Sequence, residues 1–127
     1  MYLNKTVPSH SSLFFHLHQA TMTARIVPRL KRSSSVLFVC DIQDKFRPLI
    51  HNAERLICNS KFLYDASRIM SVPCIVTEHY PKALGNTVPD LAIKHEEKDT
   101  FVFSKKLFSM MTPDVTECLE TLPISRE

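Results

Sequence analysis

Apolar residues fall along this chain into three short runs, separated by a long amphipathic stretch and then a proline-containing loop. The first run, "SSVLFVC", is continuous rather than alternating, which predicts a strand of a parallel sheet that is buried on both faces. The segments "VPCIVTE" (72–78) and "TFVFSKK" (100–106) are predicted to be two further short strands.

The stretch between the first two strands has helical periodicity. From about 52 to 70, apolar and small residues recur at steps of three and four, and charged residues take the other side. This spacing predicts an amphipathic helix of about five turns. Its predicted inward positions are Ala53, Leu56, Ile57, Ser60, Leu63, Tyr64, Ser67 and Met70. A strand, a helix and a strand of these lengths form a right-handed βαβ unit.

The rest of the chain adds a loop and a second helix. Residues 79–91 contain two prolines and the only glycine, and they are predicted to form a long surface loop. Thr112 and Pro113 are suited to the N-cap and first position of a helix that runs to about Leu122. The predicted fold class is therefore α/β, with a thin parallel sheet of three strands, two main helices and exposed sheet edges.

The first 32 residues differ in composition from the remainder. They contain basic residues and no Asp or Glu, as in a mitochondrial presequence, but they lack an obvious amphipathic helix. A disordered extension is the favoured interpretation, and Met22 offers a second start. We therefore divide the chain into a leader, 1–32, and a domain, 33–127. The expected location is the cytoplasm, or the mitochondrion if the leader is used.

Composition excludes several function classes. From residue 33 onward, eleven Lys and Arg stand against thirteen Asp and Glu, so no basic stripe for nucleic acid is expected. The apolar runs are too short to span a membrane. With Gly85 as the only glycine, neither a P-loop nor a dinucleotide-binding turn is present, and no cofactor is predicted. The four cysteines show no metal-type spacing and are expected to be reduced, buried thiols.

Charged residues follow each predicted strand. Asp41 ends the first, Glu78 and His79 end the second, and Lys105 and Lys106 end the third. Because the carboxyl ends of parallel strands meet at one edge of a sheet, these side chains are expected to converge on a site. A carboxylate and an ammonium brought together there can position a nucleophile, and a purely structural salt bridge is the alternative.

Three stretches carry a family resemblance. In order and spacing, "SSVLFVCDIQDKFR", "VPCIVTEHYPKALGNTVPDL" and "SKKLFSMM" resemble the isochorismatase-like hydrolases, above all the animal isochorismatase domain-containing proteins. The resemblance covers about 33–120. It implies a three-layer α/β/α fold with a larger parallel sheet than this chain provides, and hydrolysis of a small amide or vinyl ether by an Asp, Lys and Cys triad.

The resemblance also implies roles for particular residues. Asp41 matches the general base, and Lys105 matches the lysine that keeps this carboxylate ionised and orients the substrate. The residues assigned to substrate binding are Gln43, Phe46, Glu78 and Tyr80. Related nicotinamidases bind a metal near the second strand, but here only Glu78 and His79 lie there, as neighbours that point apart, so no metal is predicted.

The third member of the triad, a cysteine, would lie beyond residue 122, and the sequence ends at Glu127. None of the four cysteines is expected to replace it. In particular, Cys40 and Asp41 are neighbours on a strand, whose side chains point to opposite faces. The prediction is a hydrolase domain that is inactive as this chain.

Two alternatives stay open. The chain could act as a non-catalytic module that pairs its edge strand with a full-length paralogue, and homo-oligomers are expected because family members often form them. A sheet of three strands could also be too small to fold stably alone.

Overall fold

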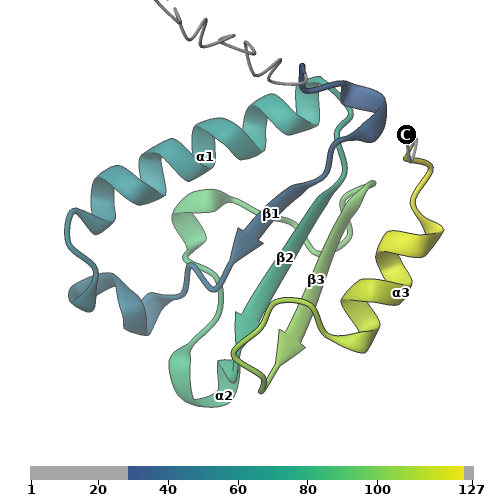
Figure 1. The fold of residues 1–127 in the computed structure, drawn as a ribbon. Coiled ribbons are helices and arrows are strands. Elements are labelled where there is room, and N and C mark those ends of the chain that lie inside the picture. Colours follow the sequence, from purple (N-terminus) through teal and green to yellow (C-terminus); the bar gives the residue numbers. More distant parts are fainter. Residues whose placement is uncertain (1–28, 125–127) are drawn as a thin grey trace, which may run out of the picture.

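The computed structural model of the protein describes residues 29–124; the leader therefore lies outside the described residues, apart from 29–32. The strands are β1 (Leu37–Cys40), β2 (Cys74–His79) and β3 (Thr100–Lys105), and the α-helices are α1 (Ala53–Ile69), α2 (Pro81–Leu84) and α3 (Pro113–Thr121) (Figure 1). Short 3-10 helices span Arg32–Ser34, Asp44–Leu49 and Pro89–Leu91. The predicted strands and main helices are confirmed.

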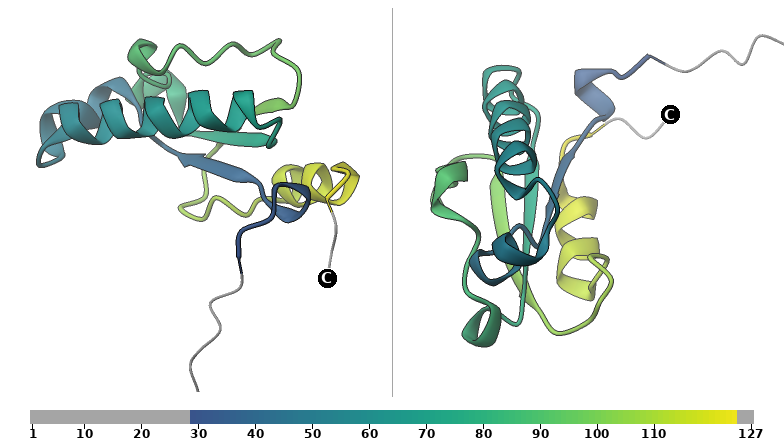
Figure 2. Two further views of the ribbon diagram at one scale, coloured as in Figure 1. Left: turned by 90° about the horizontal axis from the view of Figure 1, so that it is seen from above. Right: turned by 90° about the vertical axis from the view of Figure 1, so that its left-hand side faces the viewer.

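The three strands form one parallel sheet in the order β1-β2-β3. Helix α1 lies on one face of this sheet and α3 lies on the other, so the described residues form three layers (Figure 2). The α1 face of β2 carries Cys74 and Val76, which pack with Ile57 and Tyr64 of the helix. The α3 face carries Ile75, which packs with Val115 and Leu122. The α/β class is therefore confirmed.

Strand β1 differs from its predicted environment. Val39 is buried under α1, but on the other face Phe38 is 42% exposed and Cys40 is exposed. Helix α3 packs against residues of β2 and β3, so it does not cover β1. The prediction that the first strand is buried on both faces is therefore wrong for this chain.

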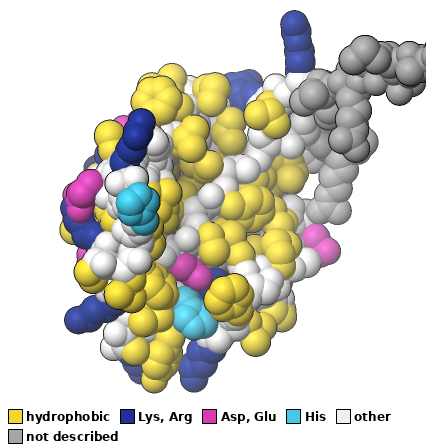
Figure 3. Space-filling model, turned by 60° about the vertical axis from the view of Figure 1, so that its left-hand side comes forward, with side chains coloured by type: hydrophobic (Ala, Val, Ile, Leu, Met, Phe, Trp, Pro, Cys, Tyr) yellow, Lys and Arg dark blue, Asp and Glu magenta, His cyan; other side chains and the backbone are white. Residues whose placement is uncertain are grey.

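Helix α1 buries a narrower stripe than its periodicity predicts. Ala53, Ile57, Tyr64 and Ser67 are buried, whereas Leu56, Leu63 and Met70 are at least 40% exposed. The three exposed positions were predicted to face inward. The sheet beneath α1 ends at β1, so it offers the helix fewer contacts than a wider sheet would. Hydrophobic side chains are visible over much of one face of the molecule (Figure 3).

The loop after β2 is more structured than predicted. It contains α2 and the 3-10 helix Pro89–Leu91, and it places Val88 and Leu91 in the core beneath α1. Between these helices Gly85 has φ 78° and ψ 173°, a region of backbone conformation that is essentially restricted to glycine.

We expect Gly85→Ala to lower the free energy of unfolding by about 1–3 kcal/mol, because a side chain strains this conformation. A Cβ at this position would also lie 3.3 Å from Cβ of Asp44. Ala92→Gly is the matched control, since Ala92 has φ 50° and glycine tolerates that conformation. Urea unfolding of both variants checks this. An equal loss in the two variants would contradict the assignment of strain to Gly85.

Arg47 connects its own 3-10 helix, Asp44–Leu49, with α1 and with the 3-10 helix Pro89–Leu91. Its guanidinium bonds Glu54 of α1 at 2.6 and 2.7 Å and Asp90 of the 3-10 helix at 2.9 Å. Hydrogen bonds from Arg47 hold the pKa values of Glu54 and Asp90 below their ordinary range. The carboxylates are therefore ionised more readily in the folded than in the unfolded chain.

A depressed folded-state pKa gives stability that is present above the unfolded values, about 4, and is lost as pH falls through the folded values. We therefore expect the free energy of unfolding to fall on acidification below pH 4, and Arg47→Met to show a smaller acid-dependent loss. Lys61→Met, which removes the exposed pair with Asp65, is the control. The measurement is urea unfolding from pH 7 to pH 3. Identical pH profiles of Arg47→Met and the unmodified chain would contradict the expectation.

Candidate active site

Asp41 occupies the first position after β1 and turns out of the strand. Its φ is 52°, a left-handed conformation that Asp adopts more readily than most residues. Its backbone N–H still donates to the carbonyl oxygen of Thr77 at 3.0 Å, so the residue stays attached to β2. A non-glycine residue held in this conformation by the surrounding structure is typical of functional sites.

The Asp41 carboxylate lies between two side chains from the neighbouring strands. Nζ of Lys105 donates to Oδ2 at 2.6 Å, and Oγ1 of Thr77 donates to Oδ1 at 2.8 Å. The Lys105 side chain is only 1% exposed, and that of Asp41 is 20% exposed. The sequence prediction that Asp41 and Lys105 meet at the carboxyl edge of the sheet is therefore borne out by the geometry.

The ammonium of Lys105 has further partners. It donates to the carbonyl oxygens of Leu107 at 3.2 Å and Phe108 at 3.4 Å. With Asp41, these acceptors match the three hydrogens of an ammonium. A buried cation with all its hydrogens engaged keeps a fixed position, and its attraction to the carboxylate is stronger than in water because the surroundings have a low dielectric constant.

Chemically, this arrangement provides a base next to a fixed positive charge. Each carboxylate oxygen of Asp41 accepts one hydrogen bond and keeps a further lone-pair direction. One of these could accept a proton from a nucleophile, and Lys105 would stabilise negative charge that develops nearby. Thr77 was missed by the sequence reasoning. Its signal is its position in β2, where its Cα pairs with that of Cys40 beside Asp41.

Gln43, predicted to bind substrate, is engaged by the protein backbone. It is 1% exposed, its Nε2 donates to the carbonyl oxygens of His79 and Gly85, and its Oε1 accepts from the His79 N–H at 2.6 Å. Both of its amide hydrogens are thus used. In this arrangement Gln43 ties the segment after β1 to the end of β2 and positions the loop that follows.

Glu78 does not join Asp41 and Lys105. Side chains alternate along β2, so Thr77 points to the α3 face and Glu78 to the α1 face, where it accepts from the Thr87 N–H at 2.7 Å. Of the strand-end residues expected to converge, Asp41 and Lys105 therefore meet, with Thr77 as a further partner, whereas Glu78 lies on the other face.

Tyr80 and Lys105 border a common cavity. Its volume is about 350 Å³, and Pro81, Ser104 and Lys106 also line it. Tyr80 is 45% exposed, and Nζ of Lys106 lies 5.9 Å from the centre of its ring. A cavity of this size is at the lower end of the range for small-molecule sites, about 300–1,000 Å³. Phe46 is half-buried in the 3-10 helix Asp44–Leu49.

Within residues 29–124, no cysteine joins the group formed by Asp41, Thr77 and Lys105. The hydrogen-bond partners of the Asp41 carboxylate are Thr77 and Lys105, and no cysteine is among them. Burial raises the pKa of Cys74 to about 12, which disfavours its thiolate. Cys40 and Cys58 are exposed, so the prediction that all four thiols are buried is wrong.

Contrary to the prediction from strand alternation, Cys40 and Asp41 do not point to opposite faces of the sheet. Strand alternation places Cys40 on the α3 face, opposite Val39. Asp41 lies outside the strand with positive φ, and its carboxylate bonds Thr77, which shares the α3 face with Cys40. The two side chains are therefore on the same side of the sheet. The partners of the Asp41 carboxylate are nonetheless Thr77 and Lys105, and no hydrogen bond joins it to Cys40.

Neither a metal-binding cluster nor a membrane-spanning helix is found within residues 29–124. Residues 29–124 hold no group of three or more His, Cys, Asp or Glu side chains that could bind a metal ion. In the same range, no helix combines the length and apolar character needed to cross a membrane.

The fold and the site define a class of protein. The isochorismatase domain family matches residues 35–126, and the chain belongs to that family. The parallel α/β architecture, with Asp41 and Lys105 at the carboxyl ends of β1 and β3, agrees with the resemblance carried by the sequence motifs. That resemblance is confirmed.

The similar proteins include both sequences and solved structures. Isochorismatase domain-containing protein 2 of Danio rerio is 42% identical over 96 residues, which cover 76% of this chain and 47% of that protein. Isochorismatase family protein 1A of Dictyostelium discoideum is 40% identical over 74% of this chain and 46% of its own length. The chain spans about half the length of the curated relatives it matches.

Among solved structures, the MAR1 ribonuclease from Caenorhabditis elegans superimposes with a TM-score of 0.68 at 43% identity. The match covers 75% of this chain and 49% of that one. A putative MAR1 ribonuclease from Leishmania major matches with a TM-score of 0.63 at 29% identity.

Proposed function

We propose that Asp41 and Lys105 are the base and the electrostatic group of an isochorismatase-type hydrolytic site that acts on a small amide or vinyl ether. The observation that carries this proposal is the 2.6 Å pair between a 20% exposed Asp41 and a buried Lys105, supported by Thr77. A paired carboxylate that retains access to solvent can exchange protons with a ligand, whereas a fully enclosed one could not.

For an amide, the proposed steps are those of covalent catalysis by a thiol. Asp41 takes the proton of a thiol, and the sulfur attacks the carbonyl carbon. The carbon–nitrogen bond then breaks as the proton passes from Asp41 to the leaving amine. Water, deprotonated by Asp41, hydrolyses the thioester and restores the thiol. Lys105 stabilises the charge on Asp41 and on the adjacent oxyanion.

The nucleophile in this proposal is not one of the cysteines of residues 29–124, because none of them bonds Asp41 or Lys105. We therefore expect the 127-residue chain alone not to hydrolyse amides. The test compares this chain alone with a chimera in which its residues 35–122 replace the matching segment of the Danio rerio relative. A panel of small amides, vinyl ethers and single-stranded RNA is supplied to both. Amide hydrolysis by the short chain through a thioester would contradict the proposal.

RNA belongs in the panel because of the solved relatives named as ribonucleases. The charge of residues 33–127 does not favour it, since acidic residues outnumber basic ones in this range. RNA cleavage in place of amide or ether hydrolysis would replace the substrate class proposed above.

The second candidate function is an interaction module, and the open edge of β1 favours it. β1 ends the strand order, and Phe38 beside that edge is 42% exposed. An uncovered edge can pair with a strand of another chain, such as a full-length family member. Size-exclusion chromatography of the chain with such a protein tests this. A stable complex supports pairing, whereas separate elution of two folded proteins counts against it.

A further inference from the structure

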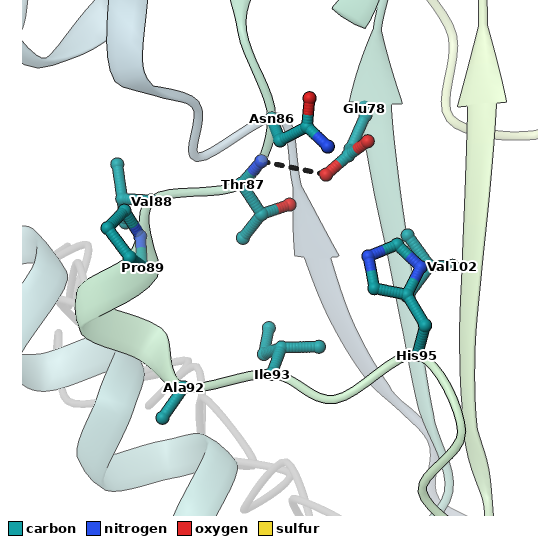
Figure 4. A pocket seen from close by; sticks show the side chains of 9 residues that line it. All are labelled: Glu78, Asn86, Thr87, Val88, Pro89, Ala92, Ile93, His95 and Val102. Carbon is teal, nitrogen blue, oxygen red and sulfur yellow. Dashed lines mark hydrogen bonds between the residues drawn. The ribbon is translucent and has the colours of Figure 1, made fainter.

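A second cavity opens on the face of the sheet opposite Asp41 and Lys105. Its volume is about 230 Å³, and it is lined by Glu78 of β2, by loop residues from Asn86 to His95 and by Val102 of β3 (Figure 4). None of the side chains that surround the Asp41 carboxylate belongs to this lining. The cavity is therefore separate from the candidate active site.

Two polar groups of this cavity lack the partners that buried groups normally have. Glu78 is 3% exposed, and its only hydrogen bond among the described residues comes from the Thr87 N–H to Oε1; no Lys or Arg of residues 29–124 forms an ion pair with it. Oγ1 of Thr87 is buried and has no partner in the same range. A buried carboxylate without a cation, and a buried hydroxyl without a hydrogen bond, both carry a desolvation cost.

The rest of the cavity is mostly apolar. Val88, Ile93 and Val102 form its walls, and His95 is exposed at its mouth. Figure 4 shows Glu78, Thr87 and His95 placed around the same opening. The volume is below that of cavities for drug-sized molecules, about 300–1,000 Å³. It fits one small molecule or one group of a larger one.

We propose that this cavity binds a small amine, with its ammonium on the Glu78 carboxylate and its apolar part against Val88, Ile93 and Val102. The ammonium supplies the missing cation, and a second N–H of the same group can donate to Oγ1 of Thr87. An anion of the same size would be repelled by Glu78. A neutral alcohol would lack the charge that strengthens the hydrogen bond. The proposal does not depend on hydrolysis at Asp41.

The test uses benzylamine, which has an ammonium on a short apolar body. It is titrated at pH 7 into the full 127-residue chain labelled with ¹⁵N, and benzyl alcohol and benzoate serve as neutral and anionic analogues. We expect saturable shifts with benzylamine at the amide of Thr87, which donates to Glu78, and at Val102. Absence of saturable shifts at these residues, or equal affinity for benzoate, would overturn the proposal.

Two variants test whether the charge of Glu78, rather than the integrity of the fold, determines the affinity for benzylamine. In Glu78→Gln the side-chain oxygen can still accept from the Thr87 N–H, but the charge is gone. We expect its affinity for benzylamine to fall by about tenfold or more. Glu117→Gln makes the same change at an exposed position of α3 and should leave the affinity for benzylamine unchanged. Equal affinities of the two variants would overturn the proposal. If Glu78→Gln does not fold, Thr87→Val removes only the unpartnered hydroxyl, and undiminished binding by that variant would overturn it.

Discussion

Replacing Lys105 by methionine should lower the free energy of unfolding by about 3–5 kcal/mol, the range found when one partner of a buried ion pair is removed. Methionine can fill much of the space, but it leaves the Asp41 carboxylate without its cation, and the carbonyl oxygens of Leu107 and Phe108 without their donor. Urea unfolding followed by circular dichroism gives the difference from the unmodified chain.

Lys106→Met is the matched control, because Lys106 is the next residue and is exposed. Exposed substitutions usually change stability by no more than about 0.5 kcal/mol. The double variant Asp41→Asn with Lys105→Met should recover part of the loss, since it removes the unpaired charge. If Lys105→Met costs no more than Lys106→Met, the buried pair does not exist as described.

The second large effect is expected from Ile75→Ala, which should lower the free energy of unfolding by about 2–5 kcal/mol. Ile75 is fully buried in the central strand and packs with Val115 and Leu122 under α3. Its truncation leaves a cavity that the rigid sheet cannot close. The strand holds Thr77 two residues further on, so loosening β2 also disturbs the Asp41 site.

Ile69→Ala provides the comparison for this prediction, because Ile69 is 86% exposed at the end of α1. The same side chain is shortened without creating a buried cavity, and the expected loss is within about 0.5 kcal/mol. The two variants are compared by urea unfolding at one protein concentration. Equal losses would show that β2 and α3 do not form the core described above.

The elements of this fold were predictable where a local pattern determines them. The apolar runs located the three strands, the helical spacing located α1, and Thr112 with Pro113 located α3. Thr112 caps α3 as predicted, its Oγ1 accepting from the Val115 N–H. The pairing of Asp41 with Lys105 was also predictable, because parallel topology brings the carboxyl ends of strands together.

Other features depend on contacts that no local pattern contains. The exposure of Phe38 and Cys40 follows from the width of the sheet and the position of α3, not from the residues of β1. The positive φ of Asp41 could not be predicted from the neighbouring residues. Because of this conformation, strand alternation does not tell whether the side chains of Asp41 and Cys40 lie on the same face.

The hydrogen-bond partners of Gln43 and the face on which Glu78 lies could not be read from the sequence for a related reason. Gln43 binds backbone groups of His79 and Gly85, which are 36 and 42 residues away in sequence. Glu78 was grouped with the active site because it ends a strand, but alternation along β2 directs it to the other face. A residue at the end of a strand is thus predicted to lie at the edge of the sheet. Which face its side chain points to depends on its place in the alternation along the strand.

The most direct test of the account measures hydrolysis by the chimera that carries residues 35–122 of this chain. Asp41→Asn and Lys105→Met are compared singly and together, with Asp44→Asn and Lys98→Met as exposed residues of the same type. If Asp41 and Lys105 act as one unit, each single variant should lose about a hundredfold or more in kcat/KM, the double variant should lose little more, and the controls should keep their activity. Full activity in either single variant, or losses that multiply in the double variant, would contradict the account.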